Sequence, residues 1–514
     1  MSFLSTKSFL SKVVLTHLLT LFGHFGFSQI TQPDRFEVDS EGANFEVISA
    51  KNQGAFLVNT VLDIPKKEFS WQVFKLDTAF NLEWNRTYAV PQNQELLGKY
   101  YSNGKLYFLF RKNEVKNRNL ELISFDQQTG QAESFVIRNY IPFVYFDFKV
   151  HNNAAVVGGY YNFRPIVILF NLQEGIPIVL PGLFEDRSEL AQISMNKNAT
   201  FDILLTGRNI LKQTTLFLYT YNYEGVLVKK TDLKPEHKKE LLFGRSKTLP
   251  DGKQIIAGVY GRSISTDYSR GVFMADVERE DEQSISYYNY ADLKNFFNYM
   301  RAKREKRVLE RIERRKIKQK RLRFNYRLLV HDLIPQGDHY ILLGEAFYPK
   351  YKNVSGTYYG SGTIMWTTNN GILKNSRVFE GFKYTHAVVL GFDKEGKLLW
   401  DNSFEINDVL SQRLEQYVHA SVSEDKIALL YVYEDFIRSK IISEDQVLEG
   451  KELTPVALKN KNDVVREGGT ELMGIESWYN NVFYVYGTQK IQNPGVDNIP
   501  LQREVFFINK VIYK

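Results

Sequence analysis

The chain has 514 residues, 43% of them hydrophobic and 24% charged, with a formal net charge of +7; this composition excludes a disordered chain. It contains no cysteine, which excludes disulfide bonds, thiolate metal sites and a thiol nucleophile. Aromatic residues make up 14% of the chain, with 37 Phe and 31 Tyr, and this enrichment favours strands over helices.

The first 28 residues have the pattern of a secretory signal peptide. Lys7 and Lys12 precede an apolar stretch over residues 13–22, and Phe27-Ser28-Gln29 follows. The apolar stretch is about half the ~20 residues that a membrane-spanning helix needs. We therefore expect cleavage after Ser28, an exported mature chain in the periplasm, and no transmembrane segment in it. A buried N-terminal helix is the alternative.

Eight copies of a short unit, a polar turn followed by a strand of alternating apolar residues, run through the rest of the chain. The turns are Gln53-Gly54, Asn103-Gly104, Asn152-Asn153, Lys197-Asn198, Asp251-Gly252, Gln336-Gly337, Glu424-Asp425 and Asn480-Asn481. Gly, Asn and Asp supply the positive φ that tight hairpins require. Most copies lie roughly 45–55 residues apart, which is the period of a propeller blade.

The repeat predicts an all-β fold, a single β-propeller of seven or eight blades over residues 29–514. A blade cannot bury both faces of its sheet alone, so blades stack and close into a ring. Two β-sandwiches whose hairpins are alike by chance are the alternative. Two long steps in the spacing predict insertions, the first over residues 291–325 and the second over residues 348–383.

The first insertion is predicted to contain one basic α-helix. Residues 301–323 hold 13 Lys or Arg, three Glu and no Gly or Pro, and these are good helix formers. The segment carries a net charge of +10 and the whole chain +7, so the remainder is net acidic. The basic balance of this protein is therefore one local feature.

Three interpretations of this helix remain open. It is a solvated face that contacts an acidic patch of its own propeller, an arm that binds an acidic protein or anionic lipid headgroups, or a nucleic-acid site. We expect no nucleic acid, because export removes that substrate and no aromatic residue within 301–323 could stack on bases. The partner-binding candidates are Arg304, Arg307, Arg311, Arg314, Arg315 and Lys318.

The second insertion, 348–383, is rich in aromatic residues and glycine and has no obvious regular structure. Long loops of this kind are usually functional or disordered. Aromatic side chains are typical of binding surfaces, so Tyr358, Tyr359 and Trp366 are further partner-binding candidates. Packing against the edge of a blade is the alternative.

No catalytic, metal or cofactor motif is evident in the chain. The eight histidines are scattered without metal-ligand spacing, and no phosphate loop, calcium loop or nucleophile elbow occurs. We therefore expect a non-catalytic protein with no cofactor. The alternative is a glycan-binding or glycan-processing propeller with carboxylates from different blades at the mouth of the ring, because such pairs leave no local signature.

Taken together, the Phe27-Ser28-Gln29 ending, the propeller repeat and the segment Phe379 to His386 resemble exported propellers of Bacteroidetes-type bacteria. That group includes the periplasmic plug subunits of type 9 secretion translocons. The resemblance implies a soluble binding or scaffold protein of the cell envelope, whose partner is an envelope protein such as an outer-membrane secretion barrel.

Overall fold

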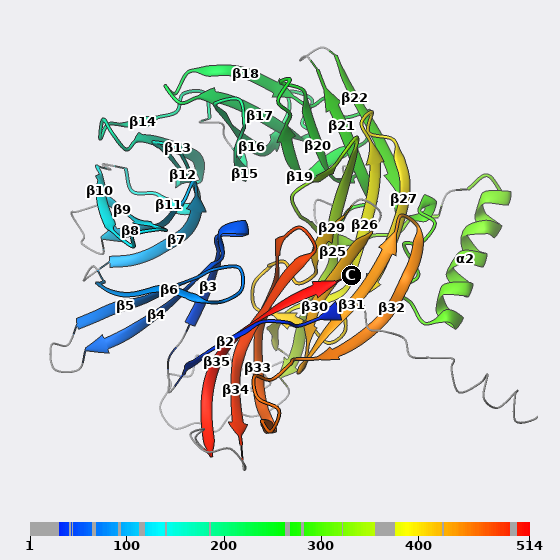
Figure 1. Cartoon of the computed structure of the whole chain (residues 1–514). Helices are drawn as coiled ribbons and strands as arrows, with labels where there is room; N and C mark the ends of the chain where they lie inside the picture. The colour runs from blue at the N-terminus through cyan, green and yellow to red at the C-terminus, as the bar shows by residue number, and fades with distance from the viewer. Residues whose placement is uncertain are drawn as a thin grey trace, which may run out of the picture.

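A computed structural model gives the fold of the chain (Figure 1). It describes residues 30–40, 43, 45–63, 68–90, 94–112, 119–138, 141–183, 187–262, 268–278, 282–320, 322–354, 376–423, 426–493 and 501–513. Within these residues the strands form eight antiparallel sheets that follow one another around a ring. The all-β propeller prediction is confirmed with eight blades, and the two-sandwich alternative is wrong. The predicted signal peptide, 1–28, lies outside the described residues.

Each blade is a separate sheet, and the blades are numbered here in chain order. Blade 1 contains β3 (Phe45–Ser49), β4 (Ala55–Asp63), β5 (Glu68–Leu76) and β6 (Leu82–Ala89); blade 2 contains β7 (Gln94–Ser102), β8 (Lys105–Lys112), β9 (Leu120–Asp126) and β10 (Ala132–Ile137); blade 3 contains β11 (Val144–His151), β12 (Ala154–Tyr161), β13 (Arg164–Asn171) and β14 (Pro177–Val179); blade 4 contains β15 (Glu189–Met195), β16 (Thr200–Arg208), β17 (Thr214–Asn222) and β18 (Leu227–Asp232).

The second half of the ring holds the two irregular blades. Blade 5 contains β19 (Glu240–Thr248), β20 (Gln254–Gly261), β21 (Gly271–Val277) and β22 (Gln283–Asn289); blade 6 contains β23 (Arg327–Val330), β24 (Ile334–Gln336), β25 (His339–Val354), β26 (Ser376–Asp393), β27 (Leu398–Glu405) and β28 (Leu410–Ser411); blade 7 contains β29 (His419–Val422), β30 (Ile427–Tyr433), β31 (Phe436–Ser443) and β32 (Gln446–Pro455); blade 8 contains β33 (Val464–Tyr479), β34 (Val482–Gln492) and β35 (Gln502–Tyr513), with β1 (Ile30–Thr31) and β2 (Arg35–Asp39).

The repeated polar turns lie between the first strands of each blade, as the sequence predicts. In blade 2, Asn103 and Gly104 both have positive φ, 49° and 74°, which is the backbone of a hairpin turn that matches the twist of its strands. The same turn begins with Asn152 in blade 3 and Asn480 in blade 8, at φ 49° and 47°. The turn at 424–425 lies outside the described residues.

The hydrophobic core consists of layers between neighbouring blades. Alternate residues of a strand point to opposite faces of its sheet, so each blade contributes one apolar row to each neighbour. Between blades 2 and 3, for example, Leu109 and Leu122 pack with Val157 and Ile168, all of them buried. Because every layer needs two blades, closure of the ring adds the last layer and leaves no blade with an uncovered apolar face.

The ring is completed by the N-terminal strands. Both β1 and β2 pair with β35, the third strand of blade 8, so the start and end of the chain share one sheet (Figure 1). The guanidinium of Arg35, which is buried, donates to Glu37, Asn509 and Gln489 at 2.7–3.0 Å and lies 4.3 Å from the ring centre of Phe507. The buried polar network fixes the position of the closing strand.

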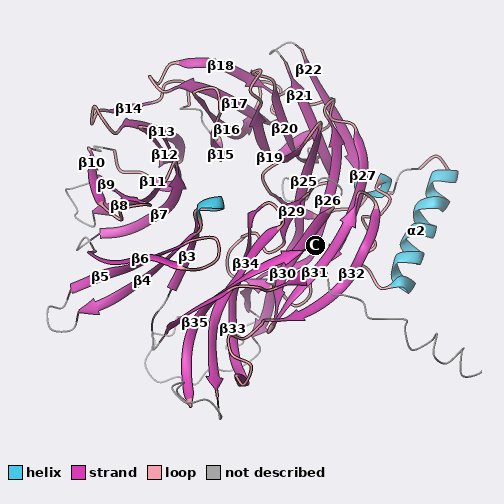
Figure 2. Cartoon of the chain, viewed as in Figure 1, coloured by secondary structure: helices cyan, strands magenta, loops and turns pink. Residues whose placement is uncertain are grey.

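Both insertions belong to blade 6. In the first, the 3-10 helix η2 (Tyr290–Asp292) follows blade 5, and the helix α2 (Ala302–Ile317) is shorter than the predicted insertion and lies outside the ring (Figure 2). No helix among the described residues is long and apolar enough to cross a bilayer. In the second, the described ends are strand rather than irregular loop, because β25 and β26 extend as a two-stranded ribbon beyond their neighbours.

Candidate functional site

The chain that leads from blade 5 into α2 is held by a buried carboxylate of blade 6. The two oxygens of Asp401 accept hydrogen bonds from the backbone N–H groups of Lys294 and Asn295, at 2.8 and 2.7 Å. The side chain of Asn295 donates to the Asp401 carbonyl, and the Ser403 hydroxyl donates to the Asn295 carbonyl, at 2.9 and 2.8 Å. Burial raises the pKa of Asp401, although these backbone hydrogen bonds oppose the shift.

An aromatic cluster completes this attachment. Phe296 is fully buried, and its ring lies 4.7–5.1 Å from those of Tyr290, Tyr326 and His386. The Tyr299 ring stacks on His386 at 3.6 Å. Burial lowers the pKa of His386 to about 3, so this histidine is neutral. The insertion therefore begins on a rigid platform and is not a free arm.

The helix α2 itself contacts the ring through one narrow face. Ile312 is its one buried residue among those the structure describes, and Glu305 and Val308 are half-buried. These positions recur at the spacing of one helix face. Glu305 in the first turn and Arg314 and Arg315 in the last complement the helix dipole.

The predicted partner-binding residues of α2 lie together and are all exposed. Five of them follow the alternating three- and four-residue spacing of one helix face, and the sixth, Arg315, borders them. We call this surface the basic stripe: Arg304, Arg307, Arg311, Arg314, Arg315 and Lys318. It extends over about 21 Å of helix.

Within the described part of the chain, no residue of the ring forms an ion pair with the basic stripe. Among the described residues, the ion pairs of α2 are Arg314 with Glu310 and Lys316 with Glu313, at 3.8 and 3.7 Å, and both lie within the helix. Exposed pairs of this kind contribute little. The interpretation in which the helix contacts an acidic patch of its own propeller finds no ion pair to support it in this part of the chain.

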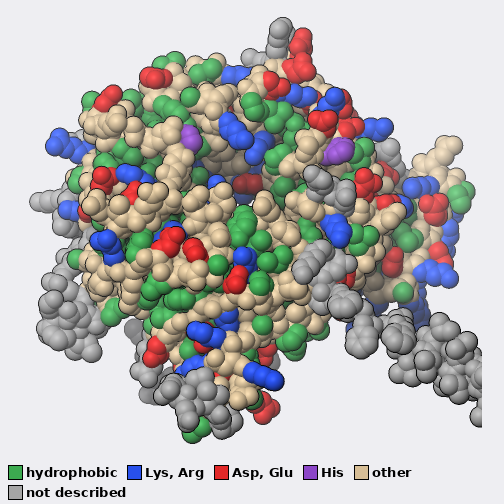
Figure 3. All heavy atoms as spheres, viewed as in Figure 1, with side chains coloured by type: hydrophobic (Ala, Val, Ile, Leu, Met, Phe, Trp, Pro, Cys, Tyr) green, Lys and Arg blue, Asp and Glu red, His purple; other side chains and the backbone are tan. Residues whose placement is uncertain are grey.

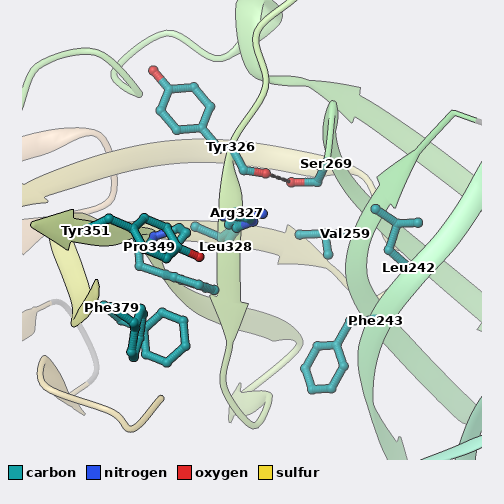
Figure 4. Close-up of a pocket in the computed structure, with 12 residues that line it drawn as sticks. Leu242, Phe243, Val259, Ser269, Tyr326, Arg327, Leu328, Pro349, Tyr351 and Phe379 are labelled. Carbon is teal, nitrogen blue, oxygen red and sulfur yellow. Dashed lines mark hydrogen bonds between the residues drawn. The ribbon is translucent and has the colours of Figure 1, made fainter. Parts of the chain in front are cut away.

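An aromatic groove lies between blades 5 and 6, at the base of the ribbon (Figure 4). The ribbon contributes one wall and blade 5 the other, and the groove has a volume of about 440 Å³, within the ~300–1,000 Å³ of ligand sites. The residues that line it are Leu242, Phe243, Val259, Ser269, Tyr326, Arg327, Leu328, Phe347, Pro349, Tyr351, Phe379 and Phe382.

Arginines gather on the rim of blade 5 beside this groove. Burial, together with the positive charges of Arg323 and Arg262, lowers the pKa of Arg270. Arg327 lines the groove, and its guanidinium lies 4.7 Å from the ring centre of Tyr268. Three separate segments contribute these cations, so the sequence gives no local sign of the cluster.

Charged side chains of both signs line the inner strands around the hollow centre of the ring (Figure 3). Glu46 on β3 forms an ion pair with Lys99 on β7. Burial raises the pKa of Glu476 on β33, although the hydrogen bond from the Tyr484 hydroxyl, at 2.5 Å, and the charge of Lys99 oppose the shift. Lys99 on β7 thus acts on carboxylates of two other blades, Glu46 of blade 1 and Glu476 of blade 8.

Two further carboxylates, Asp147 and Asp332, form ion pairs with cations. Asp147 lies 2.9 Å from Lys149, and Asp332 lies 3.4 Å from Arg245 and accepts from Gln192 at 3.3 Å. Within the residues that the structure describes, no group of three or more His, Asp or Glu side chains could hold a metal ion.

The remaining predicted candidates, Tyr358, Tyr359 and Trp366, lie outside the described residues. The aromatic groove was missed by the sequence reasoning. Its signal was the alternation of Phe347, Pro349 and Tyr351, which places three apolar side chains on one face of a strand, but the opposing wall comes from another blade.

No protein-family profile matches the chain, and no curated protein matches its sequence. Among solved structures it is similar to the acylaminoacyl peptidase of Pyrococcus horikoshii, at 9% identity and a TM-score of 0.36 over 78% of this chain and 50% of that one. It is also similar to the β-propeller domain of the Trilobed protease from Pyrococcus furiosus (8%, TM-score 0.37, 80% and 100%) and to the Dos1 propeller (12%, TM-score 0.37, 75% and 75%). The chain spans half the length of the first, and similarities this distant do not bear on activity.

Proposed function

We propose that this chain is a binding or scaffold propeller that recognises an acidic protein partner through the insertions of blade 6. The observation that carries the proposal is the basic stripe. Five exposed cations lie on one helix face with Arg315 beside them, and no carboxylate of the ring forms an ion pair with them among the residues that the structure describes. Aligned exposed charge steers association and favours a surface of opposite sign.

The platform under α2 supports the same proposal. A free basic arm would lose conformational entropy on binding, whereas a helix that is already fixed loses little. Asp401 and the cluster around Phe296 fix the chain just before α2, and Ile312 fixes the helix itself. The stripe is therefore presented in one orientation.

We further propose that the protein is exported and acts at the cell envelope. The support is the signal-like sequence of residues 1–28 and the resemblance to exported propellers. The partner we favour is an outer-membrane secretion barrel or a protein associated with one, which the propeller would contact from the periplasm as a plug. Anionic lipid headgroups near such a barrel carry negative charge, as an acidic protein partner does.

Affinity purification from envelope membranes, solubilised in mild detergent, tests this proposal. The wild-type chain is expected to recover a partner, and the double substitution Arg307→Glu, Arg311→Glu should reduce the recovery about tenfold or more. The matched control is Lys306→Glu, Lys316→Glu, which changes the net charge equally on other faces of α2. Equal losses in both variants, or no partner for the wild type, would refute the proposal; binding to anionic vesicles without protein would show that lipid is the target.

The channel carboxylates favour a second function, glycan binding or processing. Glu46 forms an ion pair with Lys99, and the charge of Lys99 also acts on Glu476, which accepts a hydrogen bond from Tyr484; glycoside hydrolysis uses a pair of carboxyl groups of this kind. Calorimetric titration with cellobiose, maltose and chitobiose tests this function. Binding that Glu476→Gln abolishes would support it, and no heat from any of the three sugars would exclude it.

A further inference from the structure

Beside the aromatic groove, part of the long strand β25 has one edge that no other described strand covers; we call this part the free edge. β23 covers that edge only as far as the pair Arg327–Phe347. Beyond it, from Tyr348 to Val354, β25 pairs with β26 alone among the described residues. This free edge is seven residues long, roughly 23 Å.

The free edge has a clear structural cause. Immediately before β23, the chain is still paired with blade 5, because Ser269 and Tyr326 exchange backbone hydrogen bonds at 2.8 and 3.2 Å. β23 therefore cannot extend along β25. The groove is the space that this departure leaves between the ribbon and blade 5.

One face of the ribbon is lined with apolar side chains toward the groove. Phe347, Pro349 and Tyr351 alternate on β25, and on β26 Phe382 lies opposite Pro349 and Phe379 opposite Tyr351. The rings are in contact, with centroids of Tyr351 and Phe379 at 5.8 Å and of Phe379 and Phe382 at 5.0 Å. Tyr351 and Phe379 remain 52% and 37% exposed.

Blade 5 provides a matching apolar wall. A β-bulge in β19 between Leu241 and Phe243 brings two consecutive residues, Leu242 and Phe243, to the groove together with Val259, because a bulge re-aims side chains. Figure 4 shows Phe379 and Phe243 on opposite sides of the opening. The walls could thus hold large apolar side chains presented by a strand lying between them.

The charge around the groove restricts what that strand can be. Arg327 lines the groove, and Arg262, Arg270 and Arg323 gather on the neighbouring rim. Among the described residues, no carboxylate forms an ion pair with Arg262, Arg270 or Arg323. Charge complementarity therefore favours an acidic occupant.

We propose that the groove binds an extended segment of a partner protein, with alternating acidic and large apolar residues, which adds as a strand to the free edge of β25. Strand addition satisfies the edge backbone while pockets select alternate side chains. The inference rests on the proposed binding function and deepens it, since it adds a second contact, of different chemistry, to the charge contact of α2.

A labelled synthetic peptide, acetyl-Glu-Phe-Glu-Val-Glu-Phe-Glu-amide, tests the groove directly on the purified full chain by fluorescence anisotropy. We expect saturable binding, and binding roughly tenfold weaker for the same peptide with Lys in place of Glu. No saturable binding, or equal binding of the two peptides, would overturn the proposal.

Backbone methylation of the probe separates strand addition from side-chain binding alone. One peptide is N-methylated on Phe and Val and a second on Glu, because alternate residues of a strand turn their N–H groups to opposite edges. Strand addition predicts that one of the two loses binding and the other keeps most of it. Equal effects of the two methylation patterns would overturn strand addition.

Substitutions on the ribbon locate the site. Phe379→Asp places in the groove a negative charge that repels the Glu residues of the peptide, and it also removes an apolar contact. It should therefore abolish peptide binding. The matched control is Val378→Asp, the same change one residue away on the opposite face of the ribbon, where Val378 is 52% exposed. Equal losses in both variants would place the peptide elsewhere; if Phe379→Asp does not fold, the methylated peptides still decide.

Affinity purification distinguishes failure of the groove from failure of the proposed function. If the partner is recovered by wild type but peptides do not bind, the groove proposal fails and the α2 proposal stands. If peptides bind at the groove but Arg307→Glu, Arg311→Glu recovers as much partner as wild type, the proposed role of the stripe fails and the groove stands.

Discussion

Among the described strands, blades 8 and 6 are the two sheets that depart from four regular strands, and they depart in opposite ways. Blade 8 takes strands from both ends of the chain, and a buried network around Arg35 locks them together. Blade 6 extends beyond the ring, with a ribbon whose edge is free and a helix that touches the ring along one stripe. The extra strands of blade 8 make contacts within the ring, whereas the insertions of blade 6 leave a strand edge and a helix face exposed.

The difference indicates where stability and where recognition lie. Removing a contact in blade 8 should weaken the whole ring, because closure makes every interblade layer possible. Removing a contact in blade 6 should alter the insertions while the ring remains folded. The two blades can therefore be compared by substitution.

The largest effect is expected from Arg35→Ala in the closing strand. Breaking a buried ion pair and leaving its partners unsatisfied costs ~3–5 kcal/mol, so the free energy of unfolding should fall by about that amount. Denaturant unfolding measures it. The control is Arg208→Ala, which replaces an exposed arginine of blade 4 and should change the free energy of unfolding by less than ~0.5 kcal/mol. A similar loss in both variants would show that the closing strand contributes no more to stability than an exposed position does.

A smaller and more local effect is expected from Asp401→Ala in blade 6. The backbone N–H groups of Lys294 and Asn295 would lose their acceptor, at a cost of ~1–3 kcal/mol for each buried donor. Hydrogen exchange should accelerate at these two amides and leave β2 and β35 unchanged. Faster exchange in blade 8 would contradict the separation of the two blades.

Acid should loosen blade 6 through its buried histidine. Burial lowers the pKa of His386 to about 3, below the ordinary value of ~6.5, so the unfolded chain binds the proton that the folded chain does not. Stability then falls as the pH decreases from about 6.5 toward 3, by at most ~1.4 kcal/mol per pH unit. His386→Phe should flatten this part of the curve, measured as the thermal midpoint between pH 7 and 4; an unchanged slope would count against a buried neutral histidine.

The smallest effect on global stability is expected from Ile312→Asp. The substitution removes the buried residue of α2 but no interblade contact, so the thermal midpoint of the ring should change little. Trypsin, which cleaves after Lys and Arg, should cut within 302–317 much faster than in wild type. Protection equal to wild type would show that Ile312 does not hold the helix.

The blades were predictable because their signals are local. A pair such as Asn103-Gly104 needs only its own positive φ to specify a hairpin, and the repeat of such turns gave the propeller. The sequence left the number of blades open between seven and eight. The pairing of Arg35 with Asn509, which completes blade 8, joins two segments far apart in the chain, and no local pattern around either residue indicates it.

One part of the candidate site could be predicted from local sequence and the other part could not. The basic stripe could be predicted because helix periodicity alone places Arg304, Arg307 and Arg311 on one face. The groove could not, since Phe243 and Phe379 come from different blades and the free edge of β25 depends on where the chain turns at Tyr326. Local patterns predict elements, whereas a groove depends on how elements meet.

The shared sheet of blade 8 also has a consequence for the order of folding. β2 can pair with β35 only after the whole chain is available, whereas blades 1 to 7 each form from contiguous sequence. Contacts between distant segments form slowly, because the chain entropy of a long loop must be lost first. The ring should therefore assemble as an open arc of blades and close in a late step, and until then the interblade faces of blades 1 and 8 remain exposed to any chaperone in the same compartment.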